Sequence, residues 1–121
     1  MLIDSNIIIY ATQPEFDRLR LFLSNQKQLS VSIVSKIETL GYHKLSGKQK
    51  KLLEEFFNAV NVVLDEAITD QSIKLRQKEN ISLADAIIAA TALVLKTPLL
   101  TRNTDDFKKV MGLKLVDPLK Q

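Results

Sequence analysis

Cysteine is absent from this 121-residue chain, and histidine occurs once, as His43. The missing cysteines exclude disulfides, thiolate zinc sites and cysteine nucleophiles, and a single histidine excludes a metal site built from several imidazoles. Any bound metal would be held by oxygen, which favours a hard cation such as Mg²⁺ or Mn²⁺. The motifs G-x-x-x-x-G-K-[ST], G-x-G-x-x-G and G-x-S-x-G are missing too, which argues against the nucleotide-binding and hydrolase classes that depend on them.

Glycine and proline are scarce, with three residues of each, so short connections are expected. No apolar run approaches the length of a membrane span, and the N-terminal stretch MLIDSNIII lacks the positive charge of a signal peptide. We therefore expect a single cytoplasmic domain over residues 1–121 with no membrane partner. The net charge of +3 is compatible with nucleic-acid binding without being diagnostic of it.

Short apolar segments alternate with longer amphipathic ones along the chain. This alternation predicts an α/β fold, a three-layer α/β/α sandwich with a central parallel sheet. The segment 5–11 is ambiguous, because its β-branched residues favour a strand whereas Ser5 or Asn6 could cap a helix. In the helix expected over 32–44, the side chains available for the buried side are those of Ile33, Ile37, Leu40 and Tyr42. The expected strands are 2–4, 29–32, 61–64, 98–101 and 114–116, and the expected helices run from Pro14 and over 32–44, 48–60, 66–79, 82–96 and 104–110.

Two acids lie close to the ends of the first two expected strands. Asp4 ends the first strand, and Glu38 lies early in the helix after the second. Each also has a purely structural interpretation, because Asp4 could cap or turn the chain at Ser5, and Ser35-x-x-Glu38 matches a capping box. Taken singly, neither acid favours catalysis over these local roles.

Asp85 is the least expected acid, because it lies in the apolar stretch 81–95. Ser82-x-x-Asp85 could be a capping pair, but a carboxylate among apolar neighbours is costly unless a partner or a metal satisfies it. Asp105 and Asp106 follow the fourth expected strand, where Thr104 could cap a helix with two acids in its first turn. One of these aspartates could stabilise the helix while the other reaches a metal.

Acids at four strand-to-helix junctions form a stronger signal than any one of them. In a parallel sheet such junctions can converge at the carboxyl ends of the strands. Clustered carboxylates repel, so they require a cation, and a bound Mg²⁺ keeps waters that can attack a phosphodiester. The sequence therefore predicts metal-dependent phosphodiester hydrolysis.

The chain resembles a PIN domain, and specifically the VapC-type toxins of bacterial toxin–antitoxin pairs. Four segments carry the resemblance; they occur in family order and spacing, and the match extends over essentially the whole chain. The resemblance implies a sheet with strand order 3-2-1-4-5. The four segments are MLIDSNIIIYA, VSIVSKIETLGY, ISLADAIIAATAL and LLTRNTDDF.

The resemblance also implies roles for individual residues. Asp4, Glu38 and Asp85 match the first three catalytic acids, and Asp106 matches the fourth, with Asp105 as its acidic neighbour. Asp4, Asp85 and Asp106 would hold the metal. The supporting residues are Asn6 beside the first acid, the site-lining hydroxyl of Thr101, Asn103 and Asp105.

Family members hydrolyse RNA with Mg²⁺ or Mn²⁺, leaving a 5′-phosphate and a 3′-hydroxyl. They are commonly homodimers and are silenced by an antitoxin protein. The resemblance thus implies an endoribonuclease toxin with these partners. Two alternatives stay open. One is a non-catalytic PIN-like module that binds RNA or protein. The other is a phosphohydrolase, although such enzymes need a second acid close to Asp4, where this chain has the amide Asn6.

Overall fold

A five-stranded parallel sheet forms the centre of the protein in the computed structural model, which describes residues 1–120. The strand order β3-β2-β1-β4-β5 is the predicted one, and all four neighbouring pairs are parallel. β1 lies between β2 and β4, with Leu2 opposite Leu99 and Ile3 opposite Leu100. The strands are β1 (Leu2–Ile3), β2 (Ser30–Ser32), β3 (Asn61–Val63), β4 (Leu99–Leu100) and β5 (Leu115–Val116).

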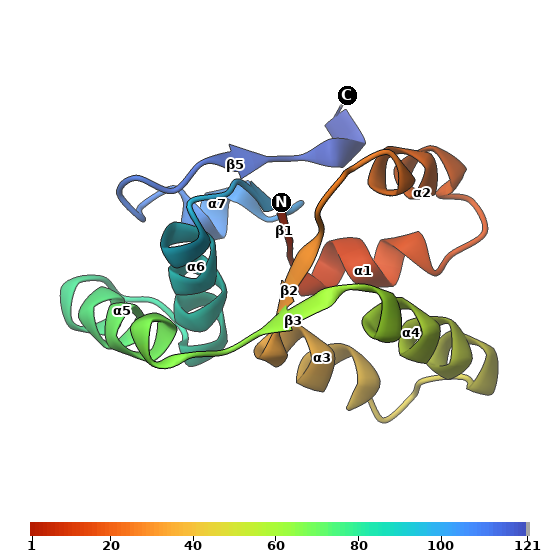
Figure 1. The fold of residues 1–121 in the computed structure, drawn as a ribbon, viewed down its shortest axis with the longest axis horizontal. Coiled ribbons are helices and arrows are strands. Elements are labelled where there is room, and N and C mark those ends of the chain that lie inside the picture. The colour runs from red at the N-terminus through yellow and green to blue at the C-terminus, as the bar shows by residue number, and fades with distance from the viewer. Residues whose placement is uncertain (121) are drawn as a thin grey trace.

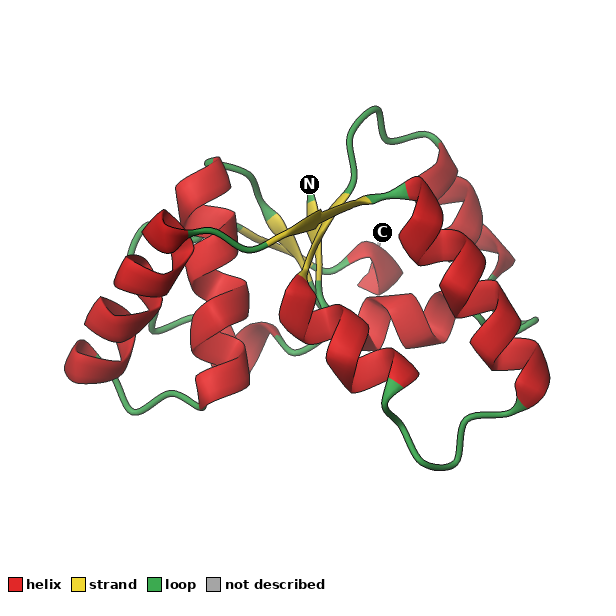
Figure 2. Ribbon diagram, turned by 60° about the horizontal axis from the view of Figure 1, so that its bottom comes forward, coloured by secondary structure: helices red, strands yellow, loops and turns green. Residues whose placement is uncertain are grey.

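Helices cover both faces of the sheet, as Figures 1 and 2 show. On one side lie α5 (Glu66–Lys78) and α6 (Leu83–Leu95), and on the other α1 (Ser5–Ala11), α2 (Asp17–Ser24) and α4 (Gly47–Ala59). α3 (Ile33–Leu40) and the short α7 (Thr104–Phe107) follow β2 and β4, and a 3₁₀ turn covers Pro118–Lys120. No helix within residues 1–120 is long and apolar enough to cross a membrane.

The alternation of side chains along β1 divides the core into two halves. Leu2 packs with α5 and α6, whereas Ile3 packs with α1, α2 and α4. Both side chains are fully buried, and each contributes about 2 kcal/mol by leaving water. The chain immediately beyond Ile3 is therefore held in place from both sides of the sheet.

Local signals explain where the helices next to the sheet begin. The ambiguous segment 5–11 is helical, because the Asp4 side chain accepts a hydrogen bond from the Ser5 N–H and caps α1. Ser82 caps α6 by accepting from the Asp85 N–H. Buried alanines along α6, among them Ala86 and Ala89, allow this helix to pack closely against the sheet.

Two details of the predicted helices are wrong. α2 begins at Asp17 rather than at Pro14, which lies in the preceding turn. The expected buried side of α3 is only partly correct: Ile33 and Leu40 are half-buried, whereas Ile37 is 66% exposed and Tyr42, beyond the end of the helix, is 50% exposed. The polar residues Ser35 and Thr39 are buried instead. This face of α3 is turned toward α1, where the Ser35 hydroxyl contacts that of Ser5.

Candidate active site

Asp4 lies at the carboxyl end of the central strand, and only 5% of it is exposed. Its Oδ1 accepts from the Ser5 N–H (2.8 Å), and its Oδ2 accepts from the Thr101 hydroxyl (2.7 Å). The pairing of Ile3 with Leu100 explains the second bond, because it places the residues after β1 and β4 side by side. Asp4 is thus both the predicted helix cap and an oriented carboxylate.

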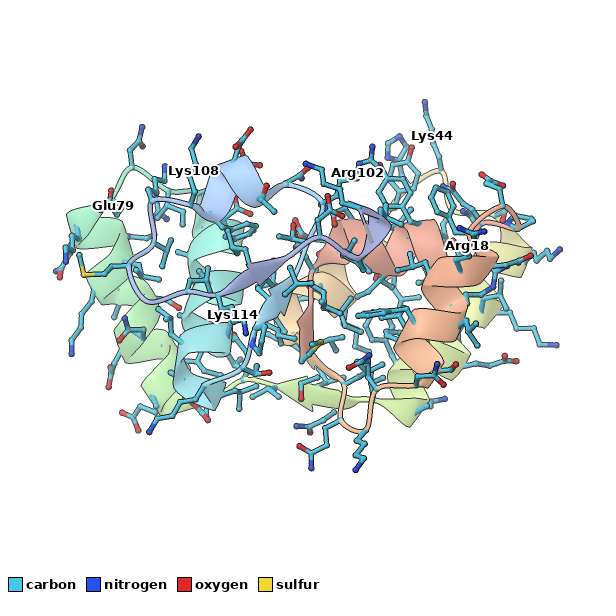
Figure 3. All side chains as sticks on the ribbon, turned by 90° about the horizontal axis from the view of Figure 1, so that it is seen from above. Arg18, Lys44, Glu79, Arg102, Lys108 and Lys114 are labelled. Carbon is cyan, nitrogen blue, oxygen red and sulfur yellow. The ribbon has the colours of Figure 1, made fainter. Side chains whose placement is uncertain are left out.

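Hydrogen bonds join the loop after β4 to the start of α1. Thr101 is fully buried and accepts from the Asn103 N–H (3.0 Å) while donating to Asp4. The Asn6 side-chain oxygen accepts from the Arg102 N–H (3.4 Å), and Figure 3 shows Arg102 beside α1. Asn103, rather than the expected Thr104, occupies the N-cap position of α7. Asn103 itself is exposed and its side chain makes no capping bond.

Glu38 comes to this site from α3. Its Oε1 accepts from the Ser5 hydroxyl (2.7 Å), which lies 3.0 Å from the Ser35 hydroxyl. Ser35 is not the start of a capping box, because Ser32 caps α3 by accepting from the Val34 N–H. Glu38 is exposed, and its negative charge raises the pKa of both Asp4 and Asp85.

Asp85 enters from the first turn of α6 and is half-buried. Burial is the main cause that raises its pKa, and the charges of Asp106 and Glu38 raise it further. A hydrogen bond with the Ser82 side chain and the charge of Lys109 act in the opposite direction. The predicted conflict between this carboxylate and its surroundings is therefore present in the folded protein.

The two neighbouring aspartates on α7 have different surroundings. Asp106 lies close enough to Asp85 to raise its pKa, whereas the Asp105 carboxylate forms an ion pair with Lys108 (3.4 Å). Both side chains are exposed, so packing does not fix either one. Asp106 is thus the α7 acid that belongs electrostatically with Asp85.

Burial has the largest effect on Asp4 and raises its pKa, while the bonds from Thr101 and Ser5 partly oppose this change. The charges of Asp85 and Glu38 raise the pKa further. Within residues 1–120, none of these carboxylates takes part in an ion pair, since the two ion pairs present are Asp17–Arg20 and Asp105–Lys108. The site therefore concentrates negative charge without a matching side-chain cation in contact.

The donor set fits a hard divalent cation. Carboxylates from four elements, an amide and a hydroxyl are the oxygen ligands that Mg²⁺ and Mn²⁺ prefer. As the side chains stand, no three acidic or imidazole groups of the described chain are close enough to share one ion. An ion shared by three of these carboxylates would therefore require their side chains to move closer together.

Ser5 and Ser35 are contacts of the site that the sequence interpretation missed. Ser5 was considered only as a helix cap, and Ser35 only as part of a capping box. The available signal was a hydroxyl next to Asp4 and another one helical turn before Glu38, on two segments expected to meet. Their long separation in sequence hid the contact.

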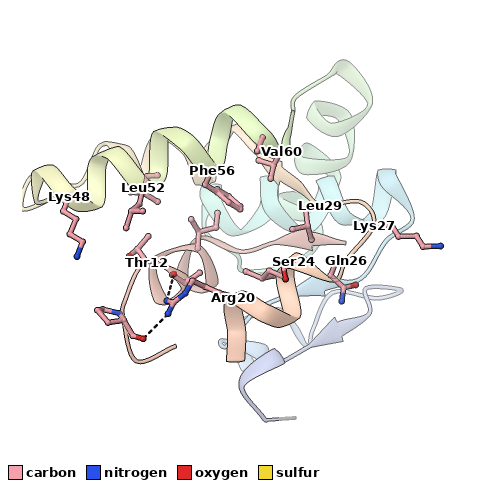
Figure 4. A pocket seen from close by; sticks show the side chains of 16 residues that line it. Thr12, Arg20, Ser24, Gln26, Lys27, Leu29, Lys48, Leu52, Phe56 and Val60 are labelled. Carbon is pink, nitrogen blue, oxygen red and sulfur yellow. Dashed lines mark hydrogen bonds between the residues drawn. The ribbon is translucent and has the colours of Figure 1, made fainter. Parts of the chain in front are cut away.

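The surface of the described chain has two hollows, of which one adjoins this region. A small one of about 370 Å³ lies beside Glu38, and its lining residues are Ser5, Asn6, Ile9, Tyr10, Glu38 and Thr39. A larger groove of about 780 Å³ lies away from the acids, between α2 and α4 (Figure 4). Leu52 and Phe56 of α4 line it, and Arg20, Lys27 and Lys48 supply its positive charges.

Comparison with known proteins gives a consistent result. A family profile described as PIN domain matches residues 1–113, and a search of curated proteins returns no match. A toxin–antitoxin complex from Klebsiella pneumoniae contains a similar chain, with 29% identity, a TM-score of 0.75, and coverage of 97% of this chain and 96% of that one.

Two further structures are similar. VapBC-1 from nontypeable Haemophilus influenzae has 25% identity and a TM-score of 0.80, covering 98% of this chain and 97% of that one. DNA-bound VapBC from Salmonella typhimurium has 18% identity and a TM-score of 0.83, covering 97% and 96%, and shows likeness of fold alone.

Proposed function

This chain belongs to the PIN-domain family, and from that premise we propose that it is a Mg²⁺- or Mn²⁺-dependent endoribonuclease, the toxin of a type II toxin–antitoxin pair. The observation that carries the proposal is the proximity of acids from four elements: the charges of Asp85 and Glu38 raise the pKa of Asp4, and the charge of Asp106 raises the pKa of Asp85. A carboxylate that is 5% exposed, with its pKa raised by burial and by two acidic neighbours, is costly to keep charged without a cation.

Each acid has a proposed role in binding the ion or orienting water. Asp4, Asp85 and Asp106 would hold the ion, directly or through water. When bound, the ion would supply Lewis-acid activation of water and neutralise charge on the phosphoryl oxygens. Glu38 would orient the attacking water or hold a second ion. Thr101 fixes the direction of the Asp4 carboxylate through its 2.7 Å bond.

Other polar residues support this arrangement. Two hydrogen bonds hold the loop that leads to Asp106: the Arg102 N–H donates to the Asn6 side chain, and the Asn103 N–H donates to the Thr101 hydroxyl. The expected products are a 5′-phosphate and a 3′-hydroxyl, as the family resemblance implies.

Asp4→Asn tests the chemistry. It keeps the size and capping ability of the side chain but removes a charged ligand, and we expect Mn²⁺-dependent RNA cleavage to fall by at least about a hundredfold. Asp65→Asn is the matched control, because Asp65 is also an aspartate at a helix N-cap and caps α5 by accepting from the Ile68 N–H, away from the acids of the site. Cleavage is measured on total RNA with Mn²⁺, with and without chelator.

Three results would contradict the proposal. They are full activity in Asp4→Asn, undiminished activity in excess chelator, or a wild-type protein that binds RNA and never cuts it. The last result would identify a non-catalytic binding module.

For the partner, we propose that the groove between α2 and α4 receives an amphipathic helix of the antitoxin. Similar chains have been crystallised in toxin–antitoxin complexes. The groove has an apolar lining, which suits the apolar face of a helix. Arg20, Lys27 and Lys48 at this groove favour acidic residues on the flanks of that helix.

Leu52→Glu tests this assignment, since Leu52 lines the groove and is 40% exposed. We expect it to abolish co-purification with the antitoxin, to be sought as the product of a short reading frame next to this gene, and to leave RNA cleavage intact. Leu21→Glu is the control, because Leu21 is 63% exposed on α2 and does not line the groove. Equal loss of antitoxin in both variants would reject the groove. We also expect a homodimer, which light scattering of the purified chain tests.

A further inference from the structure

No hydrogen bond from its own helix, α3, holds the Glu38 carboxylate in the described structure. Glu38 is an exposed residue on α3, and within residues 1–120 no basic side chain forms an ion pair with it. A free glutamate samples many rotamers, and fixing it in one of them costs side-chain entropy. A group that orients water or metal must instead be held in one place.

One hydroxyl makes the only side-chain hydrogen bond that Glu38 receives in the described chain. The Ser5 hydroxyl donates to Glu38 Oε1 at 2.7 Å, while the Ser5 backbone N–H donates to Asp4 Oδ1 at 2.8 Å. Ser5 therefore touches two carboxylates that come from different elements. Because Ser5 opens α1 directly after the buried Asp4, its own position is fixed by the sheet.

A second serine completes the arrangement. Ser35 is fully buried, lies one turn before Glu38 on α3, and has its hydroxyl 3.0 Å from that of Ser5. Each hydroxyl has one proton, so when Ser5 donates to Glu38, Ser35 is free to donate to Ser5. The resulting chain from Ser35 through Ser5 to Glu38 runs in one direction, and each bond polarises the next.

We propose that Ser5 is a positioning residue that holds the Glu38 carboxylate toward Asp4, with Ser35 orienting the Ser5 hydroxyl. This inference rests on the proposed function for its catalytic meaning, and on the two hydroxyl contacts for its geometry. Without the Ser5 hydroxyl, the Glu38 side chain turns into solvent, and its carboxylate no longer lies beside the other acids of the site. Threonine at position 5 retains the donor and is expected to preserve the arrangement.

The first measurement needs neither metal nor substrate. The order parameter of the Glu38 γ-methylene, from ¹³C relaxation of the metal-free protein, reports whether the side chain is fixed. We expect an ordered Glu38 in the wild type and in Ser5→Thr, and a mobile one in Ser5→Ala. Ser72→Ala is the control, because Ser72 is a buried serine on α5 that bonds its own helix. A Glu38 that is mobile in the wild type, or still ordered in Ser5→Ala, would overturn the inference.

The second measurement is catalytic. We expect Ser5→Ala to lower kcat for RNA about tenfold, the loss typical of a hydrogen bond to a charged group, with little change in KM. Ser5→Thr should restore most of kcat, and Ser35→Ala should cost about threefold, since it removes a neutral bond one step away. Unchanged kcat in Ser5→Ala would reject the role of Ser5, whereas an inactive wild type would reject the proposed function and leave the relaxation result to decide on Glu38.

Discussion

Asp85→Asn should stabilise the metal-free protein and remove its stabilisation by Mn²⁺. In the folded state Asp85 is half-buried on α6 and near the charges of Asp106 and Glu38, and these causes together raise its pKa. A raised pKa means that the ionised form is disfavoured in the fold relative to the unfolded chain. Asparagine removes that charge and leaves the helix cap intact, because Ser82 accepts from the backbone N–H of residue 85.

The size of the effect follows from the exposure of the site. Partial desolvation and two like-charge repulsions favour the Asp85→Asn change, while the Lys109 charge and the favourable helix-dipole energy of a first-turn acid oppose it; discounted for solvent screening, the net effect is about 1 kcal/mol. For a chain of this length that is about 4 °C in Tm. The wild type should gain about 2.7 kcal/mol from Mn²⁺ at a hundred times its Kd, or about 11 °C, and Asp85→Asn should gain little.

Thermal unfolding at pH 7, with chelator and with Mn²⁺, measures both effects. Glu66→Gln is the matched control, because Glu66 is an exposed acid in the first turn of α5, outside the site. It should lose a few tenths of a kcal/mol of favourable helix-dipole energy, the opposite sign, and keep its response to Mn²⁺. A less stable Asp85→Asn in chelator, or equal Mn²⁺ shifts in wild type and Asp85→Asn, would refute the reasoning.

Two further expectations concern the same acids. Asp106→Asn should lower RNA cleavage by about tenfold to a hundredfold, and Asp105→Asn by less than about twofold. The reason is that Asp105 pairs with Lys108, whereas the charge of Asp106 raises the pKa of Asp85. The reverse order of effects in an initial-rate assay would make Asp105 the fourth acid. The pKa values of Asp4 and Asp85 are raised above the ordinary 3.8, so the folded protein binds protons more tightly than the unfolded chain. Metal-free stability should therefore fall as pH rises from about 4 through the raised values, while Mn²⁺ affinity rises over the same range. Urea unfolding and Mn²⁺ titration across pH 4–7 measure the two trends, and parallel trends would contradict this account.

The sequence by itself determined the layers of the fold. Apolar pairs such as Leu2-Ile3 and Leu99-Leu100, separated by amphipathic segments, predict buried parallel strands with helices on both faces. The alanine-rich segment of α6 predicts close packing, and the acids at the strand ends predict where a site would form. These signals are local, because they depend on the period of side chains along one element and on the residue next to its end.

Only the tertiary structure decided which side chains meet. The bond from Thr101 to Asp4 depends on the pairing of β1 with β4, which no local pattern reports. The polar face of α3 was missed for the same reason, because Ser35 is buried by its contact with α1 and not by its own hydrophobicity. Asp105 and Asp106 are chemically alike, so only their placement around α7 distinguishes the one that pairs with Lys108 from the one near Asp85. Periodicity fixes a face of one element, whereas the register between elements is set by contacts far apart in sequence.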